Sequence, residues 1–193
     1  MVTHKIVNSL FASCSYVLKL NNQTGWIVDC GDIEPIISFM ENCQLKGILL
    51  THAHFDHIYG INKLLSKFSD ILVITNYSGK ETLLNANKNL SHYNNTPFVF
   101  EFPDSIKIVS DRDEIYLSEN LKATVFETPG HHPSCLTYLI DNLLFTGDSF
   151  IPGTKVVTHL PEGEKSQALM SIEIINNISK GKIICPGHFV CQN

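Results

Sequence analysis

Four side chains of metal-ligand type stand within six residues, in the segment His52-Ala53-His54-Phe55-Asp56-His57. Neutral imidazole nitrogens and carboxylate oxygens are the usual ligands of first-row divalent metals, and zinc is the commonest choice for this mixture. In a short loop, His52 and His54 turn toward one point, whereas Asp56 and His57 face a second point nearby. The pattern therefore predicts a metal site and hydrolytic chemistry, in preference to a polar loop of unrelated histidines.

Three further segments place a ligand-type residue after an apolar run and a glycine. These residues are His131, Asp148 and His188, which follow Gly130, Gly147 and Gly187. Glycine permits the tight backbone path that a crowded site demands. Together the four segments supply seven candidate metal ligands: His52, His54, Asp56, His57, His131, Asp148 and His188.

The elements that must position these residues alternate between strand-like and helix-like patterns, which predicts an α/β class with mixed sheets. Ligand sites of open α/β sheets gather at the carboxyl ends of strands, where these segments would lie. Residues 89–97 are expected to form a loop. The expected strands are 16–20, 26–29, 47–50, 71–74, 105–109, 121–126, 137–140, 143–146 and 183–185. The expected helices are 34–42, a helix from residue 56 or 57 to 68, 81–87 and 166–179.

The composition indicates one globular domain over residues 1–193, because 44% of the 193 residues are hydrophobic and 17% are charged. The net charge is −5 with 14 Lys plus Arg. A nucleic-acid partner is therefore not expected, since phosphate backbones require a basic surface. A small-molecule substrate is expected instead. The sequence leaves the oligomeric state open between a monomer and a homodimer.

No signal peptide or apolar run of membrane-spanning length is apparent, so we expect a cytoplasmic location without membrane contact. No pair of cysteines has the C-x-x-C spacing of a structural zinc knuckle. In a reducing compartment they are expected to be buried small hydrophobic residues. The six are Cys14, Cys30, Cys43, Cys135, Cys185 and Cys191.

Four motifs together resemble the metallo-β-lactamase fold superfamily, and most closely its glyoxalase II (hydroxyacylglutathione hydrolase)-like branch. They are THAHFDH at 51–57, TPGHHPS at 128–134, GDSF at 147–150 and PGH at 186–188. The segment Asp29-Cys30-Gly31 also resembles an acidic strand end of that family. The resemblance implies a four-layer αββα sandwich, in which two mixed β-sheets pack face to face and helices lie outside.

By position, the resemblance implies one metal at His52, His54 and His131, a second at Asp56, His57 and His188, and Asp148 as the bridge. Spacing alone does not partition the ligands in this way. The implied cofactors are two Zn²⁺ per chain, with Fe or Mn as options in one or both sites. Two such metals about 3.5–4 Å apart can share a hydroxide that attacks the carbonyl of a thioester or small ester. Asp56 is also the candidate catalytic residue, because it could orient this hydroxide or move its proton.

Several activities of the family are disfavoured by residues present here. Asp148 stands where many β-lactamases carry Cys or lack the acid, and His54 stands where the diiron flavoprotein oxidoreductases carry Glu. The acidic balance disfavours the nucleases. A thioesterase or another small-ester hydrolase, such as a lactonase, remains. The alternatives are a mononuclear iron enzyme like the persulfide dioxygenases, which would use His52, His131 and Asp148, and a metal-binding protein without turnover.

Two departures from glyoxalase II argue against assuming glutathione as the substrate. The sequence ends five residues after His188, without the C-terminal helical region of glyoxalase II, and His132 replaces the usual small residue. A loop rich in Gly and Pro, 151–165, is expected over the site. Candidate substrate-facing residues, each of which could equally be solvated or packed, are His132, Lys155, His159, Tyr77 and Tyr93.

Overall fold

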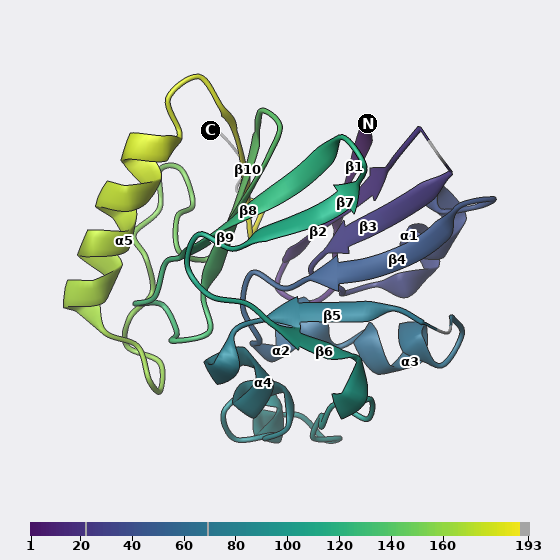
Figure 1. Cartoon of the computed structure of the whole chain (residues 1–193). Coiled ribbons are helices and arrows are strands. Elements are labelled where there is room, and N and C mark those ends of the chain that lie inside the picture. Colours follow the sequence, from purple (N-terminus) through teal and green to yellow (C-terminus); the bar gives the residue numbers. More distant parts are fainter. Residues whose placement is uncertain (22, 69, 190–193) are drawn as a thin grey trace.

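The strands form two mixed β-sheets in the computed structural model, which describes residues 1–21, 23–68 and 70–189 (Figure 1). The strands of the first sheet, in spatial order, are β1 (Val2–Val7), β2 (Cys14–Lys19), β3 (Thr24–Val28), β4 (Gln44–Leu49), β5 (Leu72–Thr75) and β6 (Ile106–Ile108). Neighbouring strands from β1 to β3 are antiparallel, and those from β3 to β6 are parallel.

The second sheet is antiparallel except for the parallel pair of its last two strands in sequence. In spatial order it contains β11 (Ile183–Pro186), β10 (Leu143–Gly147), β9 (Leu136–Ile140), β8 (Leu121–Glu127) and β7 (Glu114–Ser118). The two sheets are flanked by helices, which confirms the fold predicted from the sequence.

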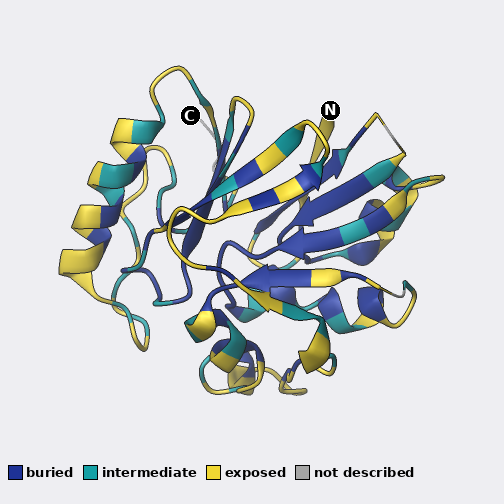
Figure 2. Cartoon of the chain, in the orientation of Figure 1, coloured by how far each residue is buried: buried dark blue, intermediate teal, exposed yellow. Residues whose placement is uncertain are grey.

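The core has two layers because successive side chains of a strand point to opposite faces of a sheet. On β3, Ile27 packs toward the helices, whereas Trp26 packs between the two sheets. On β4, Ile48 and Leu49 divide in the same way. These strands are buried on both faces, which explains why they read as continuous apolar runs. Figure 2 shows the strands as mostly buried and the outer faces of the helices as exposed.

Most of the helices lie beside the first sheet, and the longest lies beside the second (Figure 1). The outward layer of the first sheet includes Ile33, Ile58 and Leu64 from three of these helices. The longest helix packs beside the second sheet and buries Ala168, Ser171 and Ile175. The helices are α1 (Ile33–Phe39), α2 (Phe55–Ile58), α3 (Ile61–Leu65), α4 (Tyr77–Leu83) and α5 (Lys165–Ile178), with 3₁₀ turns at Ser91–Tyr93 and Pro103–Ser105.

The hairpin, the central strands and α5 lie where the sequence predicts them, but the helix predicted from residue 56 to 68 is interrupted. It forms the two short helices α2 and α3, separated at Tyr59 and Gly60. A Cβ on Gly60 would lie 2.0 Å from the carbonyl oxygen of Gly31. The amide of Gly60 donates to the carbonyl of Cys30 at 3.0 Å. This close contact with the segment after β3 takes the amide of Gly60 out of the helical hydrogen-bond ladder, while its carbonyl accepts from the amide of Leu64 at 2.9 Å as α3 begins.

The helix predicted over 81–87 is displaced, because α4 occupies Tyr77–Leu83 and shares only residues 81–83 with the prediction. Asn76 caps it, and its side-chain oxygen accepts a hydrogen bond from the amide of Gly79 at 2.8 Å. Asparagine is a preferred N-cap residue, so this signal was available in the sequence. The strands β1 and β7 were not predicted from the sequence. In β1 only Ile6 is buried, and in β7 the buried residues Ile115 and Leu117 alternate with more exposed ones.

The cysteines in the described ranges are free, and most are buried as predicted. Cys14, Cys30, Cys135 and Cys185 are buried, and Cys43 is half-buried. Cys191 lies outside the described residues. None of the helices in the described ranges combines the length and the apolar character that crossing a bilayer requires.

Helix α5 rests on the backbone of Gly130, next to one of the predicted ligands. Gly130 has a φ of +126°, and a Cβ there would lie 2.2 Å from the amide nitrogen of Ala168. The carbonyl of Gly130 accepts a hydrogen bond from the amide of Glu164 at 2.8 Å. Both the backbone conformation and the close approach therefore require glycine at this position.

We expect Gly130→Ala to lower the free energy of unfolding by about 3 kcal/mol or more, since it combines a disfavoured φ with a backbone clash. Gly153→Ala is the matched control, because Gly153 also has a positive φ (+75°) but has no atom within 4 Å of an added Cβ. The control should cost only about 1–2 kcal/mol. Chemical denaturation of both variants measures the difference, and equal losses would contradict the role given to the α5 contact.

Candidate metal centre

The seven predicted ligand residues lie together at the carboxyl ends of four strands. The segment His52–His57 follows β4, and His131 follows β8. Asp148 and His188 follow the parallel pair β10 and β11. Three overlapping groups of these side chains have donor atoms within 4.8 Å of one another. The groups are His52, His54 and His131; His52, His57 and Asp148; and Asp56, His57 and His188.

Asp148 lies between the two outer groups. Its carboxylate oxygens lie 3.6 Å from His57 Nε2, 3.6 Å from His131 Nε2 and 3.3 Å from His188 Nε2. A Cβ on Gly187 would lie 2.2 Å from Asp148 Oδ1, so the glycine of the PGH motif leaves the space that this carboxylate occupies. The geometry is therefore consistent with Asp148 as a group shared by two ions.

The donor atoms satisfy a further condition for metal binding, because some are buried without a protein partner. His52 Nε2 and Asp148 Oδ1 accept or donate no hydrogen bond among the described residues. A buried polar atom without a partner is costly and calls for an explanation. His54 Nδ1 and His131 Nε2 lie only 2.9 Å apart, as two nitrogens directed at one point would. The residues present therefore fit divalent metal ions.

The opposite ring nitrogens of three histidines are held by acceptors outside the cluster. Asp29 Oδ2 lies 3.0 Å from His57 Nδ1. The carbonyl of Val157 lies 2.8 Å from His131 Nδ1, and that of Phe11 lies 3.0 Å from His188 Nδ1. In each case the Nδ1–H donates outward, which leaves Nε2 as the lone-pair nitrogen facing the centre. Such outer partners fix the tautomer and the ring orientation of metal-binding histidines.

Asp29 is the functional residue to which we assigned no role from the sequence. It is buried and has a φ of +56°. Besides His57, its carboxylate accepts hydrogen bonds from the amide and the hydroxyl of Thr51, at 2.8 and 2.7 Å. Asp29 thus fixes Thr51, directly before the segment 52–57, and the predicted ligand His57 at the same time. The available signal was its place at the end of β3, directly before Cys30 and Gly31.

The ionisation of the cluster follows from burial and from its two carboxylates. Burial lowers the pKa of His52 and of His54 well below the usual value, and their histidine neighbours lower it further. Burial would also lower the pKa of His57, but Asp56, Asp148 and Asp29 raise it to about 9. Asp148 and Asp56 likewise outweigh burial and raise the pKa of His188 to about 11. In the metal-free protein, protonated His57 and His188 therefore balance the acids, and a bound metal would displace those protons.

The structure buries His132, a candidate substrate-facing residue, beside the cluster. Its ring is buried and packs against His54, with ring centroids 4.8 Å apart. Its Nε2 lies 3.0 Å from Glu162 Oε2, although not at the angle of an aligned hydrogen bond. Burial lowers the pKa of His132 to about 4, with His131 and Lys88 acting in the same direction and Glu162 opposing them.

Of the other predicted substrate-facing residues, the structure brings only Lys155 to the centre. A small hollow of about 30 Å³ opens at the cluster, lined by His131, Asp148, Ile151, Thr154, Lys155, Val156 and Val157. His159 lies on the same loop but is exposed and outside this lining. Tyr77 and Tyr93 are 67% and 77% exposed, and neither lines the hollow.

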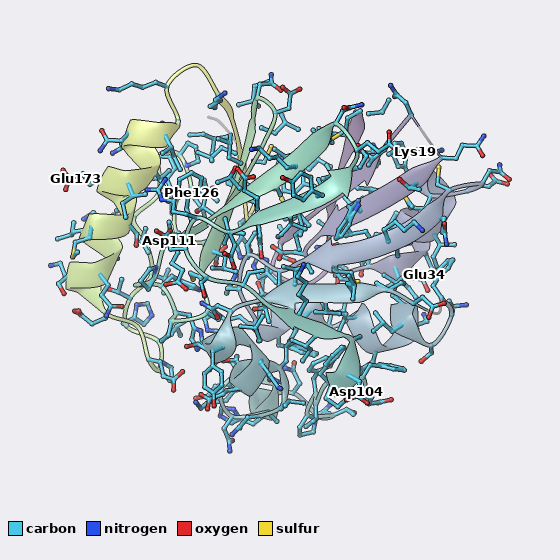
Figure 3. The ribbon with its side chains drawn as sticks, in the orientation of Figure 1. Lys19, Glu34, Asp104, Asp111, Phe126 and Glu173 are labelled. Atoms are coloured by element: carbon cyan, nitrogen blue, oxygen red, sulfur yellow. The ribbon has the colours of Figure 1, made fainter. Side chains whose placement is uncertain are left out.

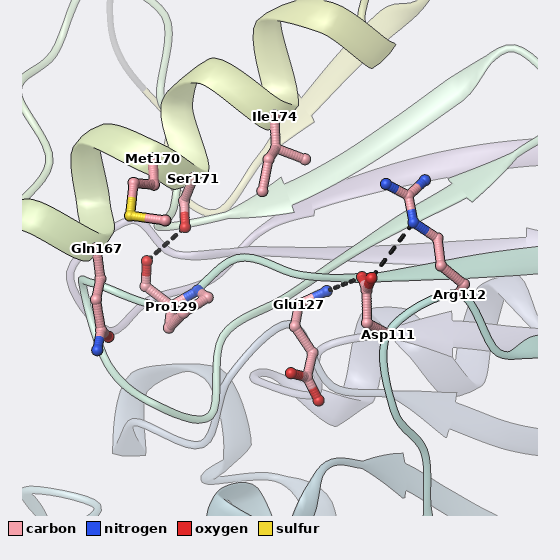
Figure 4. Close-up of a pocket in the computed structure, with 8 residues that line it drawn as sticks. All are labelled: Asp111, Arg112, Glu127, Pro129, Gln167, Met170, Ser171 and Ile174. Atoms are coloured by element: carbon pink, nitrogen blue, oxygen red, sulfur yellow. Dashed lines mark hydrogen bonds and ion pairs between the residues drawn. The ribbon is translucent and has the colours of Figure 1, made fainter.

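A second hollow, of about 290 Å³, lies between α5 and the ends of β7 and β8 (Figure 4). Asp111 and Phe126 mark this side of the molecule in Figure 3. Arg112 pairs with Asp111 and lies 4.4 Å from the ring centre of Phe126. The lining contains no histidine or cysteine, and its Asp111 is engaged by Arg112 and by the backbone amide of Glu127. The chemistry-bearing residues thus gather at the first hollow.

Comparison with known proteins agrees with this geometry. The sequence matches the family model of the metallo-β-lactamase superfamily over residues 10–188. The BLEG-1 B3 metallo-β-lactamase is similar in structure, with a TM-score of 0.84 and 26% identity over 98% of this chain and 92% of that chain.

Two further solved structures share the fold at lower identity. ETHE1 from Myxococcus xanthus has a TM-score of 0.79 and 19% identity, over 100% of this chain and 78% of that chain. TTHA1623 in a di-iron-bound form has a TM-score of 0.83 and 18% identity, over 97% and 92% of the two chains.

We expect Asp29→Asn to weaken Zn²⁺ binding at one of two sites by about 10–100-fold, because His57 loses the carboxylate that orients it. Competition titration against a chromogenic chelator measures the affinity. Asp32→Asn is the control, since Asp32 lies nearby but bonds to Ser9 and Tyr59 instead of to the cluster. Equal Zn²⁺ affinities in the two variants would show that Asp29 does not orient a ligand.

Proposed function

The chain belongs to the metallo-β-lactamase superfamily, and on that premise we propose that it is a binuclear metal-dependent hydrolase of a thioester or small ester. The superfamily and the His/Asp groups support the use of divalent metal ions. The observation that carries the proposal is the position of Asp148 within 3.6 Å of histidines from both outer groups.

Each part of the cluster has a distinct task in this proposal. His52, His54 and His131 would hold one ion, and Asp56, His57 and His188 would hold the other. When bound, two such ions polarise a carbonyl and supply hydroxide at neutral pH. Asp148 would bridge the ions and fix their separation.

Asp56 is the candidate for proton movement, because it contacts histidines of one outer group only, whereas Asp148 is the carboxylate shared by both. Its side chain is 15% exposed, and Oδ2 lies 3.3 Å from His188 Nε2 and 3.4 Å from His57 Nε2. The neighbouring positive charges of His57 and His188 lower the pKa of Asp56 despite its burial. A carboxylate in this state can orient a water molecule or accept its proton.

The residues around the hollow offer both apolar and polar contacts to a substrate at its mouth. Ile151, Val156 and Val157 supply apolar surface, while Thr154 and Lys155 supply polar groups. A thioester or ester offers both an apolar acyl chain and a carbonyl for the centre. The glyoxalase II-like motifs favour a thioester. Because His132 and its neighbours in the TPGHHPS motif depart from the family's usual residues, the alcohol or thiol that the substrate releases is left unassigned. A lactone presents the same carbonyl chemistry.

The second candidate is a mononuclear iron oxidoreductase like the persulfide dioxygenases. It would rely on His52, His131 and Asp148, which also lie together here. Structural similarity to ETHE1 is compatible with this candidate, and a di-iron-bound form of TTHA1623 shows that iron occurs in this fold. The full set of seven side chains favours the hydrolase.

Metal analysis coupled to a substrate screen tests the proposal. Purified protein should contain about two metal ions per chain and should hydrolyse thioesters or small esters, because two metals act on one carbonyl. The screen includes lactones, phosphodiesters, a chromogenic β-lactam and glutathione persulfide. One iron per chain with oxygen uptake on the persulfide would overturn the hydrolase proposal, as would turnover of the phosphodiester or the β-lactam alone.

Asp148→Ala should lower the metal content and reduce hydrolysis by about 10³-fold or more, since it removes the shared carboxylate. Asp104→Ala is the control, because Asp104 is exposed at the periphery of the molecule (Figure 3). The two variants are compared by metal quantification and by initial rates. Full activity and full metal content in Asp148→Ala would remove the bridging assignment.

A further inference from the structure

The loop of residues 151–164, here called the site loop, connects the strand β10 to α5 and forms much of the hollow. Three consecutive residues of the TPGHHPS motif hold it. The carbonyl of Gly130 accepts from the amide of Glu164, and His131 Nδ1 lies 2.8 Å from the carbonyl of Val157. His132 Nε2 lies 3.0 Å from Glu162 Oε2. One face of the site loop is therefore fastened to the segment that carries a predicted metal ligand.

The hydrogen bonds of His132 determine which of its nitrogens carries the proton. Its Nδ1 accepts from the backbone amide of Ser134 at 3.1 Å. A backbone amide can only donate, so Nδ1 is unprotonated and Nε2 carries the hydrogen of the neutral ring. Ser134 Oγ, which lies 2.7 Å from the same Nδ1, also accepts from the amide of Ala53 between His52 and His54. The Nε2 side of His132 thus lies 3.0 Å from Glu162 Oε2, without the angle of an aligned hydrogen bond, while its Nδ1 side is joined through Ser134 to the segment 52–57.

Glu162 combines a left-handed backbone conformation with contacts on two sides of its carboxylate. Glu162 has a φ of +64°, a conformation that costs a non-glycine residue free energy and that glycine adopts freely. On its solvent side, the carboxylate lies 3.6 Å from Lys88 Nζ, and Lys88 pairs with Glu81 at 3.1 Å. The side chain of Glu162 therefore joins the site loop both to the buried ring of His132 and to the segment after α4.

We propose that Glu162 is a positioning residue, which holds the site loop against His132 and thereby sets the wall of the substrate hollow. Glu162 itself does not line the hollow. Its effect passes through the site loop to Lys155, Val156 and Val157, which do. If the contact is lost, the site loop becomes more mobile, while the predicted metal ligands keep their positions. We therefore expect the affinity for the substrate to fall more than the rate of the chemical step.

Hydrogen–deuterium exchange of the site loop tests the contact in the metal-loaded protein without any substrate. Glu162→Asn is the main variant, because asparagine tolerates a positive φ but is one methylene shorter. It should speed exchange of peptides from 151–164 by about tenfold, because the site loop loses its contact with the buried ring and opens locally more often. Glu162→Gln retains an oxygen at the original reach and should stay within about threefold of the wild type. His132→Asn removes the other partner and should reproduce the effect of Glu162→Asn.

Kinetics provide the second readout, which rests on the proposed function. With the best substrate of the screen, Glu162→Asn should raise KM by about tenfold and leave kcat within about twofold. Glu114→Asn is the control, because the side chain of Glu114 is as exposed as that of Glu162 (39%). Glu114 pairs with Lys122 on the adjacent strand and makes no contact with the site loop. Unchanged exchange and KM in Glu162→Asn would overturn the inference, and so would a Gln variant as impaired as the Asn variant. If the wild type hydrolyses nothing, the proposed function fails, while the exchange data still decide the role of Glu162.

Discussion

The structure depends on holding buried imidazole and carboxylate groups within a few ångströms of one another. Charges removed from water must be compensated nearby, and here the two acids are matched by histidines whose pKa they raise. Such crowding is stable only on a rigid support. The layer between the sheets provides it, because Leu49, Tyr138 and Phe145 lie fully buried directly behind the strand ends that carry the cluster. The core therefore serves to keep the donor atoms in place.

The orientation of the donors depends on parts of the chain that are far from them in sequence. His57, His131 and His188 are each held by an acceptor from another element: Asp29 at the end of β3, the carbonyl of Val157 in the site loop, and the carbonyl of Phe11 before β2. A ligand histidine is thus aligned only when the tertiary structure is complete. This explains how one sandwich can carry a metal centre assembled from four strand ends.

The ligand types, the strand runs and the fold could be predicted because they depend on residue identity and spacing. His52 to His57 carries its chemistry in its side chains, and strands such as 47–50 are marked by their continuous apolar runs. Val157 and Phe11 could not be identified, since a backbone carbonyl has no signature in the residue type. The contact of His132 with Glu162 joins positions 30 residues apart and depends on the path of the loop. Gly60 interrupts a regular apolar stripe because of a tertiary contact with Gly31.

The last ligand, His188, is joined to the first turn of the chain. Ser13 forms a β-bridge with His188, the amide of Cys14 donates to the carbonyl of Gly187 at 2.7 Å, and that of Phe189 donates to Ala12 at 3.0 Å. Synthesis on the ribosome proceeds from the N-terminus, so the turn at residues 11–14 emerges some 175 residues before its partner. Until residue 188 is available, the turn has no partner and the cluster lacks one imidazole. The complete set of predicted ligands therefore forms only when two segments far apart in the chain have met.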